Sequence, residues 1–188
     1  MRKIFKYRNG KIKIFKDENP LIKDYEYEWK KRQIKVKTVE MPLPFRLGIE
    51  LAVHVGGKIC YGMLAAQVNA HNKRDCVNLL LAYTQKNTVR YTGTGLIDDS
   101  HVYKGLPEEY AAGILDRSAS AISQTEVFPQ CSICFEDSAN CEVGSSPMFF
   151  GAIAEMIINI IGTGSVDEIF SLDAETFSRC YAKGLNLR

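Results

Sequence analysis

The chain has 188 residues, 46% of them hydrophobic, which is enough for one core but leaves little room for two independent domains. No export signal is expected, because residues 1–6 lead into further basic residues and not into an apolar run. The most apolar stretch, residues 148–161, is shorter than the roughly 20 residues that span a bilayer. A cytoplasmic protein without a membrane segment is therefore expected.

The net charge of +2 hides an uneven distribution of charge along the chain. Residues 1–37 contain 13 of the 24 Lys and Arg but only 5 of the 22 Asp and Glu. The remainder of the chain is acidic on balance. The two parts are therefore expected to differ in the partners that they attract.

The N-terminus is predicted to be a β-hairpin. Residues 3–8 and 11–16 consist of basic and apolar side chains, and they flank Asn9 and Gly10. This dipeptide is strongly favoured in the type I′ turn that closes a two-residue hairpin loop.

Such a turn would give the hairpin one basic face. It would pair Arg8 with Lys11 and Lys6 with Lys13, so that these four side chains lie on the same side. The face has two interpretations, a surface for RNA or an acidic partner, or an edge hairpin whose solvated lysines prevent aggregation.

A boundary is predicted after the basic segment. A polar stretch at 17–32 is followed by strict alternation at 33–40, which is typical of a half-buried strand. Pro42 and Pro44 then interrupt the chain. We therefore predict a basic N-terminal β appendage at 1–40 and a main α+β domain at 41–188.

The main domain is predicted to alternate strands and helices. Gly56 and Gly57 join two expected strands, and Pro107 is placed to begin a helix. The expected strands are 47–55, 61–68 and 127–135, with 77–83 as strand or helix; the expected helices begin near 107 and cover 148–161 and 174–183.

The search for catalytic chemistry gives one weak candidate. The sequence has no P-loop, dinucleotide fingerprint or His-Glu-x-x-His pattern, so no nucleotide or other cofactor is expected. Asp98, Asp99 and His101 form the densest polar cluster and could bind a metal or move protons. The alternative for this cluster is a solvated turn.

The six cysteines are predicted to be free thiols. Cys131 and Cys134 form the only Cys-x-x-Cys, but in a strand residues three apart point to opposite faces, so no metal site is expected. Cys141 is expected in an exposed loop at 137–142, where neighbouring carboxylates would raise its pKa.

Three segments, in order, resemble domain IV of elongation factor G and the related ribosomal-protection factors. Residues 56–64, Gly-Gly-Lys-Ile-Cys-Tyr-Gly-Met-Leu, resemble the family's Gly-Gly-Arg-Gly-Gln-Tyr-Gly-His-Val. Residues 105–110, Gly-Leu-Pro-Glu-Glu-Tyr, resemble its Gly-x-x-Pro-x-Glu-Tyr helix start. Residues 142–150 resemble its Asp-Val-Asp-Ser-Ser-x-x-Ala-Phe.

The resemblance implies a two-layer α+β sandwich of the ribosomal-protein-like type, with a left-handed βαβ crossover, to which an N-terminal hairpin and a C-terminal helix are added. In the family, two loops at the tip of this domain enter the decoding region of the ribosome. The corresponding residues here are Gly56, Gly57, Lys58, Asn140 and Cys141.

The leading hypothesis is thus a non-enzymatic protein associated with the ribosome or RNA. The basic hairpin would supply nonspecific attraction for phosphate. One alternative is a small-molecule enzyme on the same fold that uses the polar loop with Asp98, Asp99 and His101. Another is a protein-interaction or accessory module that docks an acidic partner. The sequence does not rank oligomeric states.

Overall fold

The computed structural model describes residues 1–18, 26–41, 44–85, 89–98 and 101–182. The strands formed by these residues are β1 (Arg2–Tyr7), β2 (Gly10–Lys16), β3 (Glu28–Lys35), β4 (Thr38–Val39), β5 (Phe45–Val55), β6 (Lys58–Ala70), β7 (Cys76–Tyr83), β8 (Val102–Lys104), β9 (Phe128–Pro129) and β10 (Cys131–Cys141). The helices are α1 (Glu108–Ser123), α2 (Pro147–Gly162), the 3₁₀ helix η1 (Val166–Ser171) and α3 (Ala174–Tyr181).

One large sheet forms the first layer of the molecule. Its strand order is β1-β2-β5-β6-β10-β7-β3, with β8 paired to the far end of β10. The pairs are antiparallel except for β10 and β7, which run parallel. Strands β4 and β9 form a separate two-stranded sheet.

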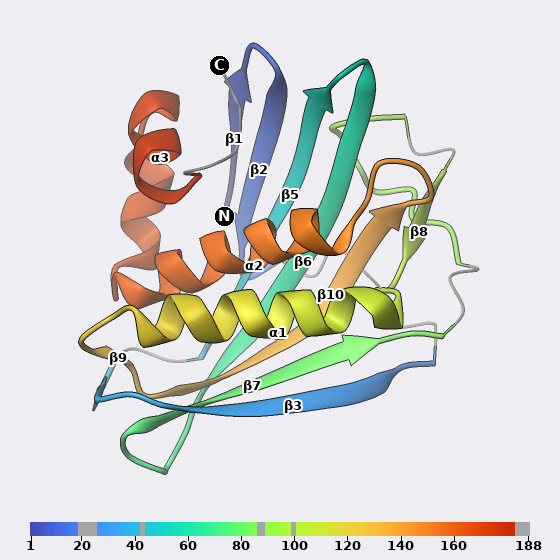
Figure 1. The fold of residues 1–188 in the computed structure, drawn as a ribbon. Helices are drawn as coiled ribbons and strands as arrows, with labels where there is room; N and C mark the ends of the chain where they lie inside the picture. The colour runs from blue at the N-terminus through green and yellow to red at the C-terminus, as the bar shows by residue number, and fades with distance from the viewer. Residues whose placement is uncertain (19–25, 42–43, 86–88, 99–100, 183–188) are drawn as a thin grey trace.

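Helices α1 and α2 form the second layer and lie across one face of the sheet (Figure 1). The apolar run in α2 explains this packing, because Phe150, Ile153 and Ile157 are fully buried against the strands. Tyr110 and Ile114 of α1 belong to the same hydrophobic core. The α+β class predicted from the sequence is confirmed. Neither of these helices nor any other described helix has the length and apolarity needed to span a bilayer.

The N-terminal segment contributes strands to both edges of this sheet. Strands β1 and β2 extend it beside β5, and β3 closes the opposite edge beside β7 (Figure 1). Phe5, Ile12 and Ile34 from this segment are buried in the same core as the helices. The division of the chain at residue 41 stays a prediction, but strands on both sides of it belong to one sheet.

The predicted register of the N-terminal hairpin is wrong, because the turn lies one residue earlier than expected and each residue's partner is therefore shifted by two positions. The turn is formed by Arg8 and Asn9, so that Tyr7 pairs with Gly10 and Lys6 with Lys11. Gly10 itself lies in β2, and a Cβ there would overlap the Ala52 carbonyl oxygen of β5. The glycine is therefore needed for close strand packing and not for the turn.

Two other local predictions are also corrected. Residues 137–141, expected in an exposed loop, are the last part of β10 and pair with β6 and β8. The strand expected at 33–40 instead covers 28–35 and continues only as the two-residue β4. The open run 77–83 is a strand, β7.

The sheet face opposite the helices is partly covered. Tyr91 and Leu96, which follow β7, pack there against Tyr61 and Met63 of β6 and form a second, smaller apolar cluster. The polar side chains of β2 and β5 on this face lie beside that cluster. We call this side of the sheet the open face.

Candidate functional site

Three connections lie at one end of the sheet, and we refer to them together as the tip: the β1–β2 turn at 8–9, the β5–β6 turn at 56–57 and the β10–α2 loop at 142–146 (Figure 1). Gly56 and Gly57 have φ angles of 55° and 79°, which side-chain-bearing residues rarely adopt. A Cβ at either position would meet nothing within 4 Å. The predicted glycine turn is confirmed, and it projects into open space.

The β5–β6 hairpin and the β10–α2 loop are in contact. Gly144 has a φ of 104° and packs on the backbone of Ile59, whose carbonyl oxygen a Cβ would overlap. The Ser145 hydroxyl donates to the Tyr61 carbonyl oxygen at 2.6 Å and accepts from the Cys141 N–H at 2.8 Å. The structure therefore brings together the two segments that the resemblance pairs.

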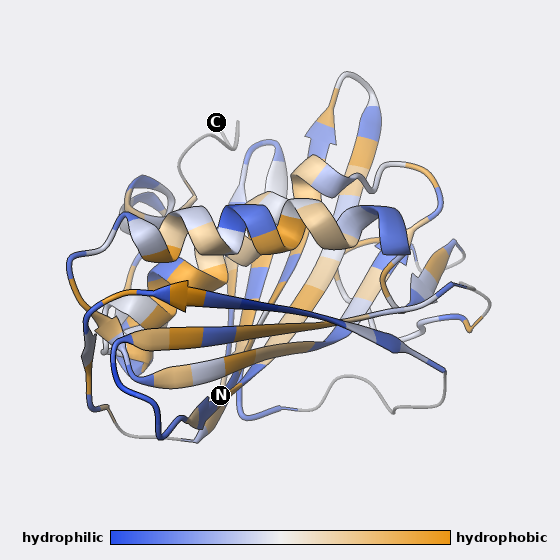
Figure 2. Ribbon diagram, turned by 60° about the horizontal axis from the view of Figure 1, so that its bottom comes forward, coloured by the Kyte–Doolittle hydropathy of each residue, from blue (hydrophilic) through white to orange (hydrophobic). Residues whose placement is uncertain are grey.

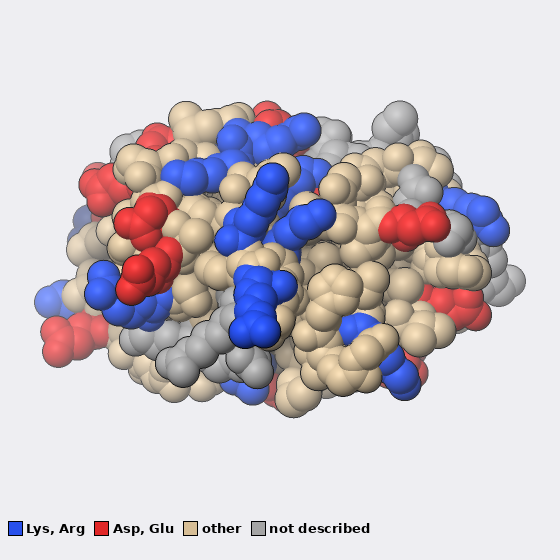
Figure 3. Space-filling view, turned by 90° about the horizontal axis from the view of Figure 1, so that it is seen from above, with Lys and Arg blue, Asp and Glu red and all other residues tan. Residues whose placement is uncertain are grey.

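The N-terminal hairpin adds positive charge to the same end. Its turn is attached to β5 by a 2.7 Å hydrogen bond from the His54 N–H to the Asn9 carbonyl oxygen. Four cations here are exposed and form no ion pair with a described residue: Lys6, Arg8, Lys11 and Lys58. Figure 3, which looks onto this end, shows Lys and Arg gathered across its middle and acidic residues toward its sides.

Lys13 does not belong to this exposed basic surface, contrary to the sequence prediction. Its side chain is 9% exposed, and its Nζ is 2.6 Å from Oε2 of Glu50, which is fully buried. Strand alternation places the Lys13 side chain on the open face, where β2 and β5 pair and Lys13 lies directly opposite Glu50. A lysine at this depth requires a counter-charge, and Glu50 supplies it.

Asn140 is also misplaced by the sequence prediction. It is 4% exposed, and its Nδ2 donates to the Gly105 carbonyl oxygen at 2.8 Å. Its amide therefore holds the start of the α1 segment against β10 and does not face solvent. Cys141, the next residue, is half-buried at the end of β10.

The polar loop of the enzyme alternative is exposed where the structure describes it. Asp98 and His101 both face solvent, and His101 Nδ1 is 4.0 Å from Oε2 of Glu142 with both side chains more than 60% exposed. Asp99 lies outside the described residues. Within the described ranges, no three His, Cys, Asp or Glu side chains gather closely enough to hold a metal ion.

The two cysteines of the Cys-x-x-Cys face different environments. Cys131 is fully buried in the main core, where burial raises the pKa of its thiol to about 12. Cys134 is half-buried and alternates to the open face. This agrees with the prediction that the pair points to opposite sides of the strand.

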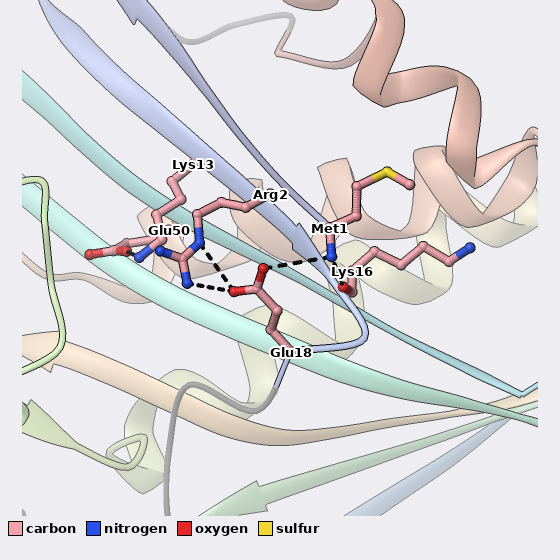
Figure 4. Close-up of polar contacts among 6 residues, drawn as sticks. All are labelled: Met1, Arg2, Lys13, Lys16, Glu18 and Glu50. Carbon is pink, nitrogen blue, oxygen red and sulfur yellow. Dashed lines mark hydrogen bonds and ion pairs between the residues drawn. The ribbon is translucent and has the colours of Figure 1, made fainter.

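Sequence reasoning missed a buried polar network on the open face. Besides Lys13, Glu50 accepts a 3.0 Å hydrogen bond from the Tyr61 hydroxyl, whose pKa is raised by burial and by the Glu50 charge. Arg2 lies beside the Lys13–Glu50 pair and bonds to Glu18, whose pKa it lowers (Figure 4). The signal was present, since Glu50 is the single charge in the apolar run 47–53.

One cavity lies away from the tip. It has a volume of about 760 Å³ and lies at the start of α1, lined among others by Lys30, Gln85 and Glu108. The Lys30 ammonium occupies this region itself, 3.0 Å from a Glu108 carboxylate oxygen and above the Tyr83 ring.

Comparisons with protein-family models, with curated proteins and with solved structures found no match to this chain.

Proposed function

We propose that this chain is a non-enzymatic protein that associates with RNA or the ribosome through its tip. The observation that carries the proposal is the gathering of exposed cations on two adjacent hairpins, Lys6, Arg8 and Lys11 on one and Lys58 on the other, none of them paired with an acidic residue that the structure describes. Phosphate groups are the partners that such a surface attracts without sequence preference.

The glycine turn favours a nucleic-acid partner further. With no side chains at Gly56 and Gly57, the backbone N–H groups of the turn can approach a phosphate closely, and Lys58 follows directly. The neighbouring loop at 142–146 would add a second contact at the same end.

The arrangement of β7, α1 and β10 supports a fold like domain IV of elongation factor G. In Figure 1 the two strands run to the right, α1 lies in front of them and β10 lies above β7. This path supports a left-handed crossover, which is rare among proteins, and it is the crossover that the resemblance implies. The fold would place the tip where that family contacts the ribosome.

The test is binding to purified ribosomes and to unstructured RNA over a range of salt concentrations. The variant Lys6→Gln/Arg8→Gln/Lys11→Gln is expected to bind more weakly, and the slope of log affinity against log salt should fall by about 3, one for each lost phosphate contact. Replacement of side chains leaves the β1–β2 pairing intact, whereas truncation at residue 41 would remove three strands of the sheet.

A charge-matched control removes the same number of cations elsewhere. Lys37, Arg90 and Arg179 are exposed and lie outside the tip, so their replacement by Gln should leave the salt slope within about one unit of that of the original chain. Equal weakening by both triple variants would mean that only net charge matters. That result, or no binding at low salt, would reject the tip as an RNA surface.

A second candidate function, a protein-interaction module, has one observation in its favour. Four apolar side chains are exposed near the tip, with exposed fractions between 40% and 75%: Val55, Ile59, Val143 and Met148. Such a group is typical of protein-binding surfaces. If Val143→Ser/Met148→Ser weakened ribosome binding while the basic triple variant did not, a ribosomal protein and not RNA would be the partner.

A further inference from the structure

Strand β3 carries two different faces. Ile34 is buried in the core beneath the helices, and Lys30 and Arg32 reach the same side, where they form ion pairs with Glu108 at 3.0 Å and Asp116 at 2.5 Å of α1. Because side chains alternate along a strand, the residues between them lie on the open face. These are Trp29, Lys31, Gln33 and Lys35, and with Tyr27 they make up what we call the β3 face.

The cations of the β3 face differ from those on the helix side in having no counter-charge. Lys31 and Lys35 are exposed and form no ion pair with any residue that the structure describes. Figure 2 shows β3 hydrophilic over most of its length beside the largely apolar β7. Positive charge on this face is therefore available to a partner.

The neighbouring strands add uncharged hydrogen-bonding groups and a groove. Gln33 Nε2 donates to Asn78 Oδ1 of β7 at 2.9 Å, and Lys73 Nζ donates to Gln33 Oε1 at 3.3 Å. A groove of about 320 Å³ runs along this part of the sheet, lined among others by Lys31, Gln33 and Asn78. The positions of β7 and β10 nearest to this face, Asn78, Leu80, Ser132 and Cys134, are uncharged, and the next residue on this side of β10, Glu136, is paired with Arg46 of β5 at 2.8 Å.

Two aromatic rings stand at one end of the face. Trp29 is 38% exposed and Tyr27 is 37% exposed, and the rings meet edge to face at a centroid distance of 5.2 Å. Tryptophan is on average a highly buried residue, so an accessible indole at the edge of a sheet is unusual. Exposed aromatic rings beside lysines are the combination that holds unstacked bases and their phosphates.

We propose that the β3 face binds single-stranded nucleic acid, with bases stacked on Trp29 and Tyr27 and the backbone held by Lys31 and Lys35. The charge on the face is complementary to phosphate, and the rings exclude a duplex, whose bases are already stacked. The inference deepens the proposed function and rests on it for the class of partner, since it names an unpaired strand. It places that strand on a surface distinct from the tip.

An acidic peptide is the competing occupant. It would add through backbone hydrogen bonds to the outer edge of β3, which pairs with no other strand in the described part of the chain, and it would need the lysines but not the rings. The role of Trp29 therefore separates the two occupants. The chain provides a direct reporter, because Trp29 is its only tryptophan.

The experiment titrates the full chain with a short uridine oligonucleotide while its intrinsic fluorescence is recorded. Parallel titrations use the matching deoxythymidine strand, an RNA duplex of equal charge and a poly-glutamate peptide. The expected result is quenching of Trp29 by single strands and not by duplex or peptide. The comparison of ribo- and deoxyribo-strands shows whether the 2′-hydroxyl contributes.

Variants assign the binding to the face. Trp29→Ala is expected to weaken binding of a labelled uridine strand about 5- to 150-fold, the range found for loss of one stacked base. Lys31→Gln/Lys35→Gln should weaken it and lower its salt dependence. The matched control, Lys30→Gln/Arg32→Gln, removes two cations from the same strand on its helix side and should leave affinity within about twofold.

Each outcome assigns the result to one proposal. Binding of single strands without quenching, unaffected by Trp29→Ala but weakened by the Lys6/Arg8/Lys11 variant, would overturn the β3 face and leave the tip proposal standing. If poly-glutamate quenched the Trp29 fluorescence and bound the Trp29→Ala variant with unchanged affinity, an acidic peptide would be the ligand of this edge. That result would overturn the inference. No binding of any nucleic acid at low salt would reject both proposals.

Discussion

Replacing Lys13 with methionine should lower the free energy of unfolding by about 3–5 kcal/mol, the usual cost of removing one partner from a buried ion pair. Methionine has a similar length, so packing changes little. The loss arises because Glu50, which is fully buried, would retain only the Tyr61 hydroxyl as a hydrogen-bond partner among the described residues. For a chain of this size each kcal/mol moves the Tm by about 2–4 °C, so the Tm should fall by about 6–20 °C.

Urea unfolding followed by far-ultraviolet circular dichroism would measure this loss. Lys11→Met is the control, because Lys11 is exposed two positions away in β2 and its replacement should cost under about 0.5 kcal/mol. Lys13→Met/Glu50→Gln should recover much of the stability, since no unpaired charge is then buried. If Lys13→Met unfolded at the same urea concentration as Lys11→Met, the charge of Lys13 would not be needed in the folded protein, and this reasoning would be refuted.

Three further predictions concern stability and reactivity. Ser146→Ala should destabilise the protein by about 1 kcal/mol in the same assay, because the Ser146 hydroxyl caps the first turn of α2. The Tyr83 hydroxyl donates a hydrogen bond to the Glu28 carboxylate, which raises the pKa of Tyr83 to about 12. The contribution of this hydrogen bond to stability should be complete below about pH 10 and should be lost as the pH rises toward about 12. An ultraviolet titration of the phenolate would measure this pKa. A thiol reagent should modify exposed Cys180 in the folded protein and Cys131 only on unfolding, which peptide mass analysis would reveal.

Elements whose signals are local could be predicted from the sequence. The strands around Gly56 and Gly57 and the helix after Ser146 are specified within a few residues, by a turn that needs positive φ and by a cap beside an apolar run. The start of α1 next to Pro107 could be predicted for the same reason, because the proline and the two acidic residues after it are local signals. Each of these segments keeps its local preference in the folded chain.

Pairings between distant segments could not be predicted in this way. Asn9-Gly10 has the local preference of a turn, but Gly10 lies against the β5 backbone, and this contact moves the turn to Arg8 and Asn9. Residue 140 has the polar character of a loop, but its amide satisfies the Gly105 carbonyl inside the sheet. The pairing of β3 with β7 is also a long-range contact. It determines on which side of the sheet Trp29 and Lys30 lie.

The candidate surfaces depend on which cations have partners, and net charge alone does not reveal this. The basic N-terminal segment divides in the structure into cations whose charge is used within the fold and cations that remain available. Those used within the fold include Arg2, Lys13, Lys16, Lys30 and Arg32. Those available among the described residues include Lys6, Arg8 and Lys11 at the tip and Lys31 and Lys35 on the β3 face. These two groups of cations lie near opposite edges of one sheet. A single extended nucleic acid would therefore have to cross the open face to contact both groups. Two separate segments could instead bind the two groups independently. Combining the tip variant with the β3-face variant distinguishes these cases, since independent sites give additive losses in binding free energy and a shared strand does not.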